Sequence, residues 1–229
     1  MIKTLIADDN LSYAKNIINN IISKITDIKL EYVCTNGKET LDAISKKPFD
    51  LIFLDLQLPK LNGLEILKEI NRLNSVKKPK VIIISGDMPL IEQIKSYDNI
   101  CNIILKTESN DVICRKIEEV VNDMKYELTY STVKLKVVSE LTEMGYNFKY
   151  VGTKYILESI MYIYENNTFD LLDNLEKNVY KIVSYNNHKT LENVKTNIIK
   201  STKLRHRNNE KITPKSVITQ ILIKIYDES

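Results

Sequence analysis

The sequence is poor in the residues that build disulfide frameworks, zinc sites and imidazole-based catalysts. Its 229 residues include three cysteines, two histidines and no tryptophan. Cys34, Cys101 and Cys114 are odd in number and widely spaced, which argues against a disulfide framework and a metal cage and favours a reducing cytoplasm. The apolar runs are too short to cross a bilayer, and the first residues do not form a signal region. We therefore expect a cytoplasmic protein without a membrane partner.

Positive charge is concentrated in one part of the chain. The formal net charge is +3, divided as −1 over residues 1–130 and +4 over residues 131–229. The segment 189–207 holds six basic residues against one acid, Glu192. A basic concentration of this kind indicates a polyanionic partner for the second half of the chain.

The first half alternates strand-like and helix-like patterns. Short apolar or β-branched runs predict strands at Thr4–Ala7, Leu30–Cys34, Leu51–Leu54, Val81–Ser85 and Ile103–Leu105. Between them lie longer segments whose apolar residues are three and four apart. Such an alternation predicts a parallel α/β sheet with helices on both faces.

The pattern changes near residue 126. Tyr126–Thr132 is polar and predicts an irregular linker, and only helical periodicity follows it. Gly145 is a candidate C-cap, and Thr213-Pro214 is typical of a helix start. We therefore predict an α/β domain over 1–125, a linker over 126–132 and an all-helical domain over 133–229.

Five polar residues follow or end the predicted strands of the first half: Asp8, Asp9, Asp55, Ser85 and Lys106. The carboxyl ends of parallel strands meet at one edge of the sheet, so these side chains are expected to share one crevice. Three carboxylates in one pocket need a cation, and ligands that are all oxygen favour Mg²⁺. A lysine ammonium and a hydroxyl beside the metal complete a receptor for a phosphoryl group.

These residues, in this order with Pro59, Gly63 and Gly86, resemble the receiver domains of two-component response regulators. The resemblance covers about residues 1–125 and implies a flavodoxin-like, doubly wound sheet of five strands. It also implies that Asp55 is the phosphoacceptor and that Lys106 and Ser85 contact the phosphoryl oxygens. Asp9, Asp55 and the backbone carbonyl of Gln57 would hold Mg²⁺, with Asp8 acting through water. The phosphodonor would be a histidine kinase or a phosphotransfer protein.

Two positions depart from the family pattern. Ile103 replaces the usual aromatic switch residue, and Thr107 replaces the usual proline after the lysine. A cis peptide before a non-proline residue costs roughly 2.5–4 kcal/mol, which favours a trans peptide and a differently shaped loop. One hypothesis is that phosphoryl transfer is retained while its coupling to output is atypical. The alternative is that Ile103 simply packs and another residue carries the switch.

The basic segment predicts an amphipathic helix. Leu191, Val194 and Ile198 form its apolar stripe. An arc of about 80° on the other side, at 100° per residue, holds Asn193, Thr196, Lys200, Lys203 and Arg207. With a preceding helix over about 171–185 and a turn at 186–189, this pattern is typical of a helix-turn-helix unit. Its lysines and arginine would contact phosphates, and Asn193 or Thr196 would reach base edges.

Residues 138–145 and 152–164 resemble the start of an all-helical DNA-binding effector. That effector belongs to the master response regulator of endospore sporulation, and the resemblance covers about residues 133–229. It implies a similar fold and binding of double-stranded DNA. The recognition face departs from the family at Lys195, Thr196, Ile199 and Lys200, and Asn208–Ile212 is too short for the family's additional helix. The target sequence and the sporulation role are therefore not carried over.

The sequence thus predicts a transcription factor, with phosphorylation favouring a homodimer on adjacent DNA half-sites. The alternative is a phosphorylation-controlled adaptor whose helical half binds a protein partner. An enzymatic output is not expected, because residues 131–229 contain no nucleophile–base pair, metal-ligand cluster or glycine-rich phosphate loop.

Overall fold

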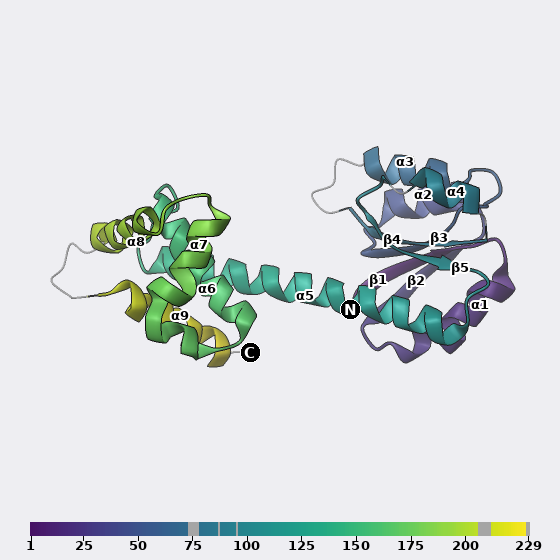
Figure 1. Ribbon diagram of the computed structural model, residues 1–229. Coiled ribbons are helices and arrows are strands. Elements are labelled where there is room, and N and C mark those ends of the chain that lie inside the picture. Colours follow the sequence, from purple (N-terminus) through teal and green to yellow (C-terminus); the bar gives the residue numbers. More distant parts are fainter. Residues whose placement is uncertain (73–77, 87, 95, 206–211, 228–229) are drawn as a thin grey trace. The chain divides into compact units, whose positions relative to one another are not determined.

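The computed structural model describes residues 1–72, 78–86, 88–94, 96–205 and 212–227, and it divides into two units (Figure 1). Unit 1 is Met1–Tyr126 and unit 2 is Glu127–Ser229. Helix α5 (Asn110–Glu143) contributes residues to both units. Each unit has its own hydrophobic core.

Unit 1 contains a five-stranded parallel sheet, as predicted. Its strands are β1 (Ile2–Ala7), β2 (Ile28–Cys34), β3 (Leu51–Asp55), β4 (Lys80–Ser85) and β5 (Ile100–Leu105). Their spatial order is β2-β1-β3-β4-β5, and all neighbours are parallel. The order reverses between β1 and β3, and open α/β sheets bind their ligands at such a switch point, beyond the carboxyl ends of the strands.

Helices cover both faces of this sheet. They are α1 (Leu11–Asn20), the short η1 (Ile22–Lys24), α2 (Gly37–Lys46), α3 (Gly63–Arg72), α4 (Met88–Ile94) and the first part of α5. Figure 1 shows α1 and α5 on one face and α2, α3 and α4 on the other. Two separate apolar clusters follow from this arrangement. One contains Ile17 of α1 and Ile117 of α5, and the other contains Ala43 of α2 and Leu67 of α3.

Side-chain caps fix where several of these helices begin. Asn36 Oδ1 accepts from the Glu39 amide at the start of α2, and Glu39 Oε2 accepts from the Thr35 amide. At the start of α3, Asn62 and Glu65 exchange two hydrogen bonds of 3.0 and 2.9 Å. These reciprocal pairs satisfy amides that have no partner within the helix, so the loops at the ends of β2 and β3 pass into helices at fixed residues.

Unit 2 is helical, as predicted. After α5 it contains α6 (Val151–Asn166), the 3₁₀ segment η2 (Phe169–Asn174), the π segment η3 (Glu176–Tyr180), α7 (Lys181–Asn186), α8 (Leu191–Arg205) and α9 (Pro214–Asp227). Ile156, Ile160, Val194, Ile198 and Ile221 are completely buried in its core. Among the described residues of both units, no helix is long and apolar enough to span a membrane.

Two local predictions were wrong. Residues 126–132 are not an irregular linker but part of α5, where Thr132 Oγ1 donates to the Leu128 carbonyl. Tyr126 and Leu128 are exposed. A helix without a buried face does not repeat apolar residues every three or four positions, so its sequence does not reveal it. The single helix expected over 171–185 is divided among η2, η3 and α7. By contrast, Gly145 has a φ of 85°, which fits its predicted place after the end of α5.

Candidate functional site

Strand register brings the predicted acidic residues to one level of the sheet. Ala7 pairs with Leu54 across β1 and β3, so Asp8 and Asp55, which follow them, lie side by side at the carboxyl ends of these strands. Asp55 in turn pairs with Ile84 of β4, and Ser85 of β4 pairs with Leu105 of β5. Lys106 follows directly, and its amide donates to the Ser85 carbonyl at 3.2 Å.

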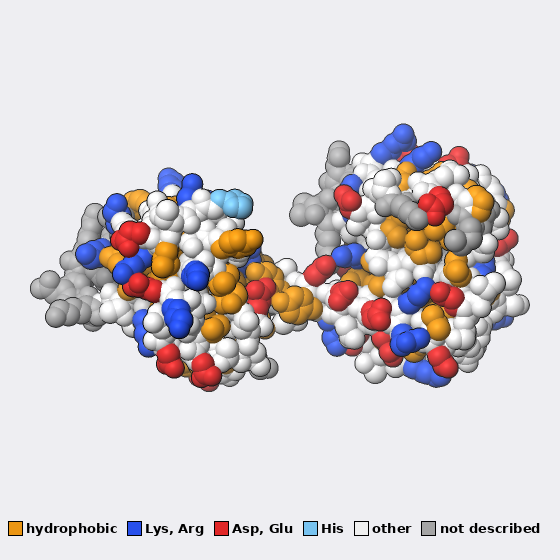
Figure 2. Space-filling view, in the orientation of Figure 1, with side chains coloured by type: hydrophobic (Ala, Val, Ile, Leu, Met, Phe, Trp, Pro, Cys, Tyr) orange, Lys and Arg blue, Asp and Glu red, His pale blue; other side chains and the backbone are white. Residues whose placement is uncertain are grey.

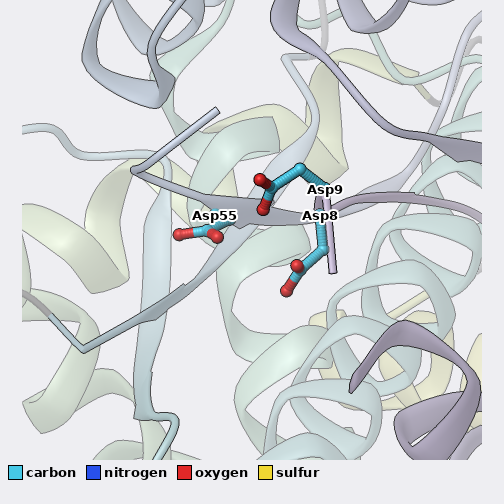
Figure 3. A group of neighbouring side chains, drawn as sticks. All are labelled: Asp8, Asp9 and Asp55. Carbon is cyan, nitrogen blue, oxygen red and sulfur yellow. The ribbon is translucent and has the colours of Figure 1, made fainter. Parts of the chain in front are cut away.

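Three carboxyl groups gather at this edge (Figure 3). Each of Asp8, Asp9 and Asp55 offers an oxygen within 4.8 Å of the other two. Asp8 and Asp55 are 1% and 3% exposed, whereas Asp9 is exposed to solvent. Burial of carboxylates in each other's neighbourhood is unfavourable without compensating charge. The site therefore combines a buried negative centre with one carboxylate that solvent reaches.

Lys106 supplies positive charge to the two buried carboxylates. Its Nζ lies 2.7 Å from Asp55 Oδ2, with a hydrogen bond, and 3.0 Å from Asp8 Oδ2. The Asp8 contact is an ion pair without good hydrogen-bond alignment, so Asp8 Oδ2 has no aligned donor among the described residues. Burial raises the pKa of Asp8, and Lys106 offsets this in part. Burial alone would lower the pKa of Lys106, but the hydrogen bond to Asp55 and the negative charges of Asp55 and Asp8 outweigh it and raise that pKa.

Backbone amides hold the remaining oxygens of the two buried carboxylates. Asp55 Oδ1 accepts from the Gln57 amide at 3.0 Å, and Asp8 Oδ1 accepts from the Asn10 amide at 2.8 Å. Gln57, whose carbonyl is the predicted metal ligand, thus lies in the loop that directly follows Asp55. Ser85 is completely buried at the end of β4, the strand next to those that carry Asp55 and Lys106. The structure therefore brings the predicted receiver residues to one edge of the sheet.

The two positions that depart from the family pattern lie at the β5 end of this edge. The peptide between Lys106 and Thr107 is trans. Ile103 is half-buried and packs against the core, and its carbonyl accepts from Lys116 Nζ at 2.8 Å. Lys116 also pairs with Glu108 at 2.7 Å, and Glu108 Oε2 accepts from the Leu105 amide. An ion pair and a backbone hydrogen bond thus hold the loop after β5.

Sequence reasoning missed Tyr13, which lies in α1 beside the acidic site. The centroid of its ring is 5.1 Å from Lys106 Nζ, and its hydroxyl is buried without a hydrogen-bond partner in the described part of the chain. Burial raises the pKa of that hydroxyl. Tyr13, Ile17 and Ile21 share the four-residue spacing of a helix, so the sequence marks Tyr13 as a core residue rather than a site residue.

The predicted DNA-contacting residues of α8 differ in their surroundings. Asn193, Lys200 and Lys203 are exposed. Lys195 pairs with Glu176 at 2.6 Å, and Thr196 is half-buried with its hydroxyl bonded to Glu192. Arg207 lies outside the described residues. In the view of Figure 2, lysine and arginine side chains lie over α8 interspersed with acidic ones.

Comparison with known proteins decides the family. The family model described as "Response regulator receiver domain" matches residues 4–118, half of the chain. The chain belongs to the response regulator receiver family. The response regulatory domain of protein mrkE from Klebsiella pneumoniae shares the fold, with a TM-score of 0.51 and 18% identity over 55% of this chain and 99% of that domain. A receiver domain implies a histidine kinase or a phosphotransfer protein as its partner.

Two relatives show the extent of the similarity. An uncharacterized response regulatory protein of Shewanella oneidensis is 28% identical over 152 residues, which cover 60% of this chain and 62% of that protein. A protein-glutamate methylesterase/protein-glutamine glutaminase 1 of Methanospirillum hungatei JF-1 is 36% identical over 89 residues, which cover 38% of this chain and 24% of that protein. The chain therefore spans less than two thirds of the length of either relative.

Proposed function

We propose that this receiver accepts a phosphoryl group on Asp55 from the phosphohistidine of a histidine kinase or phosphotransfer protein. One observation carries the proposal: Asp55 ends β3 with its Oδ2 2.7 Å from Lys106 Nζ, inside a group of three carboxylates. A buried carboxylate held beside an ammonium is a nucleophile whose neighbour can neutralise charge that develops on an incoming phosphoryl group.

The residues of this site fit Mg²⁺. Against three carboxylates, the described ion pairs place one ammonium, that of Lys106, which leaves a formal surplus of negative charge. The available ligand atoms are oxygens, which Mg²⁺ prefers, and Asp8 Oδ2 is a buried oxygen without an aligned hydrogen-bond donor in the described part of the chain. Asp9, Asp55 and the Gln57 carbonyl would hold the ion, with Asp8 acting through water. Bound there, Mg²⁺ would neutralise charge on the transferred group.

The proposed phosphoryl transfer takes place between the residues of this site and the donor histidine. An Asp55 carboxylate oxygen forms a bond to phosphorus as the phosphorus–nitrogen bond to the donor histidine breaks, and the imidazole keeps that electron pair. Lys106 then exchanges its contact with Asp55 for the new phosphoryl oxygens. Ser85, buried on the neighbouring strand, would donate its hydroxyl to one of them. The receiver needs no general base, because attack by a carboxylate oxygen releases no proton.

The chemistry is tested with a small phosphodonor, such as phosphoramidate, in place of the kinase. We expect the full chain to gain one phosphoryl group by intact mass in the presence of Mg²⁺, and to gain none when EDTA replaces it. Asp55→Asn should abolish the gain. Asp42→Asn, at an exposed aspartate of α2, is the matched control and should label normally. Labelling that persists in Asp55→Asn would contradict the assignment.

We further propose that unit 2 binds double-stranded DNA through α8. The support is the exposure of Lys200, Lys203 and Asn193 on a helix that follows α7 after a short turn. In that turn His188 has a φ of 52°. The resemblance of residues 133–229 to the sporulation effector points the same way. Phosphorylation would favour a homodimer, and two linked α8 helices on adjacent half-sites would gain affinity through effective concentration.

The alternative output is an adaptor that binds a protein. Tyr185, at 80% exposure on α7, is the observation that favours it, because large exposed aromatic residues are enriched where proteins bind each other. Selection from a genomic DNA library separates the two outputs, using the full chain with beryllofluoride as the phosphoryl mimic. An enriched motif that is lost in Lys200→Ala/Lys203→Ala supports DNA binding. Absence of any enriched motif, from folded protein, supports the adaptor.

A further inference from the structure

Tyr13 lies against the cation of the phosphorylation site. The centroid of its ring is 5.1 Å from Lys106 Nζ, within the distance at which a ring face attracts an ammonium. The Lys106 side chain is 25% exposed, so solvent screens this attraction less than it would at an open surface. The ammonium over this ring is thus the same one that contacts Asp55 and Asp8.

The position of Tyr13 is itself fixed by the acidic site. Asp8 Oδ1 accepts from the Asn10 amide at 2.8 Å, and Asn10 Oδ1 caps α1 by accepting from the Ser12 and Tyr13 amides, each at 3.1 Å. Tyr13 therefore lies in the first turn of α1, and its amide is bonded to a cap residue that the Asp8 carboxylate holds in place. A closed set of contacts runs from Asp8 through Asn10 and Tyr13 to Lys106, and from Lys106 back to Asp8.

A ring suits this place better than another charged group would. An ammonium has three N–H donors, and two of its contacts are the Asp55 and Asp8 carboxylates. When Asp55 becomes an acyl phosphate, Lys106 must turn a donor to the phosphoryl oxygens. A third carboxylate would compete for that donor, whereas an uncharged ring face attracts the ammonium without occupying it through a strong hydrogen bond.

We propose that Tyr13 is a positioning residue that holds the Lys106 ammonium beside Asp55 through its ring face; this inference rests on the proposed phosphoryl transfer to Asp55. The hydroxyl has no part in this role. It is buried without a hydrogen-bond partner among the residues described, so a phenylalanine ring would serve equally well. The ring, and not the hydroxyl, is the feature to remove.

The kinetic test compares Tyr13→Phe with Tyr13→Leu in the full chain. At saturating Mg²⁺ and phosphoramidate, we expect Tyr13→Leu to lower the rate constant of Asp55 phosphorylation about threefold to tenfold, which lies within the range of one partly exposed cation–π contact. Tyr13→Phe should stay within about twofold of the unaltered chain by the same reasoning. In a Lys106→Met background, Tyr13→Leu should cause no further loss, because the ring acts through Lys106. An equal loss in both backgrounds would overturn the proposal.

A second measurement reports the contact without any phosphorylation. By NMR, the ring should shift the Lys106 ε-CH₂ proton resonances upfield in the unaltered chain and in Tyr13→Phe, and Tyr13→Leu should remove that shift while its amide spectrum remains that of a folded chain. Unshifted Lys106 protons in the unaltered chain would overturn the proposal. A ring-dependent shift in a chain that takes no label on Asp55 would uphold the contact and refute the proposed phosphorylation instead.

Discussion

Asp8 and Asp55 are nearly inaccessible carboxylates, and burying such groups is costly unless they are paired and hydrogen-bonded. Lys106 satisfies one oxygen of Asp55 and approaches one of Asp8, while backbone amides take the others. The two residues nevertheless differ. Asp55 has a donor at each oxygen, whereas Asp8 Oδ2 lacks an aligned donor among the residues that the structure describes. This difference supports the proposal that Asp55 is the phosphoacceptor and that Asp8 would act through a water of the bound Mg²⁺.

At the same residue scale, burial makes Cys34 a poor nucleophile. Burial raises the pKa of its thiol from 9.0 to about 11. A thiolate is the reactive form, so at pH 8 the reactive fraction should be about 100-fold below that of an ordinary thiol. We expect iodoacetamide to label Cys34 at pH 8 at least that much more slowly than glutathione, by peptide mass spectrometry. Because the pKa is raised, protection should weaken as the pH approaches 11. Labelling of Cys34 at the glutathione rate in folded protein would contradict this prediction.

At the scale of elements, the start of α3 is packed directly on the end of β3. A Cβ added at Gly63 would lie 2.4 Å from the Asp55 carbonyl oxygen and 2.7 Å from Leu56 Cα. Both atoms belong to the backbone, so Gly63→Ala must displace either α3 or the strand end that carries Asp55. We expect a loss of about 1–3 kcal/mol in the free energy of unfolding, typical of overpacking, and slower phosphorylation.

Gly86 provides the matched control for that substitution. It follows β4 at the same edge of the sheet, and a Cβ added there meets nothing within 4 Å. Gly86→Ala should leave both the urea midpoint and the labelling rate of Asp55 nearly unchanged. Equal effects of the two alanines would show that the edge responds to any lost glycine and not to the contact at Gly63.

Helix α8 depends on a similar close approach in unit 2. A Cβ at Gly152 of α6 would lie 2.0 Å from the carbonyl oxygen of Asn197, which is in the middle of α8. We expect Gly152→Ala to push α8 away, speed amide hydrogen exchange in Leu191–Arg205 and weaken any DNA binding. Val151→Ala, at the exposed position beside it, should leave the exchange of α8 unchanged. Unaltered α8 exchange in Gly152→Ala would refute the dependence.

The elements that the sequence predicts well are those with a buried face. The inner strands β1, β3 and β4 were found because their apolar runs are buried on both sides of the sheet, and Asp55 followed from its place at a strand end. The edge strands β2 and β5 were found from apolar runs that are only partly buried. The helical course of Tyr126–Thr132 was missed because exposed helix leaves no apolar period. The pairing of Lys195 with Glu176 could not be predicted, since it depends on the π segment that places Glu176 near α8. Tyr13 was not predicted to be a site residue, because its helical spacing is that of a residue in the hydrophobic core.

At the scale of the whole molecule, the acidic site and the proposed output surface lie in units with separate cores. The acidic site uses residues of unit 1 alone, and the proposed DNA contacts use residues of unit 2 alone. A substitution in one site should therefore leave the fold of the other unit intact. This separation allows the output to be measured on the full chain with Asp55 intact or replaced.

The salt dependence of DNA binding then distinguishes the outputs on the full chain. Each phosphate contact releases counterions, so Lys200→Ala and Lys203→Ala should each reduce the slope of log K against log salt concentration by about 0.9. Lys149→Ala, an exposed lysine outside α8, should leave the slope unchanged. Lys195→Ala should reduce the slope less than either, because Lys195 already pairs with Glu176. If all four variants keep the slope of the unaltered chain, α8 does not contact the DNA backbone, and Tyr185 on α7 becomes the place to look for a protein partner.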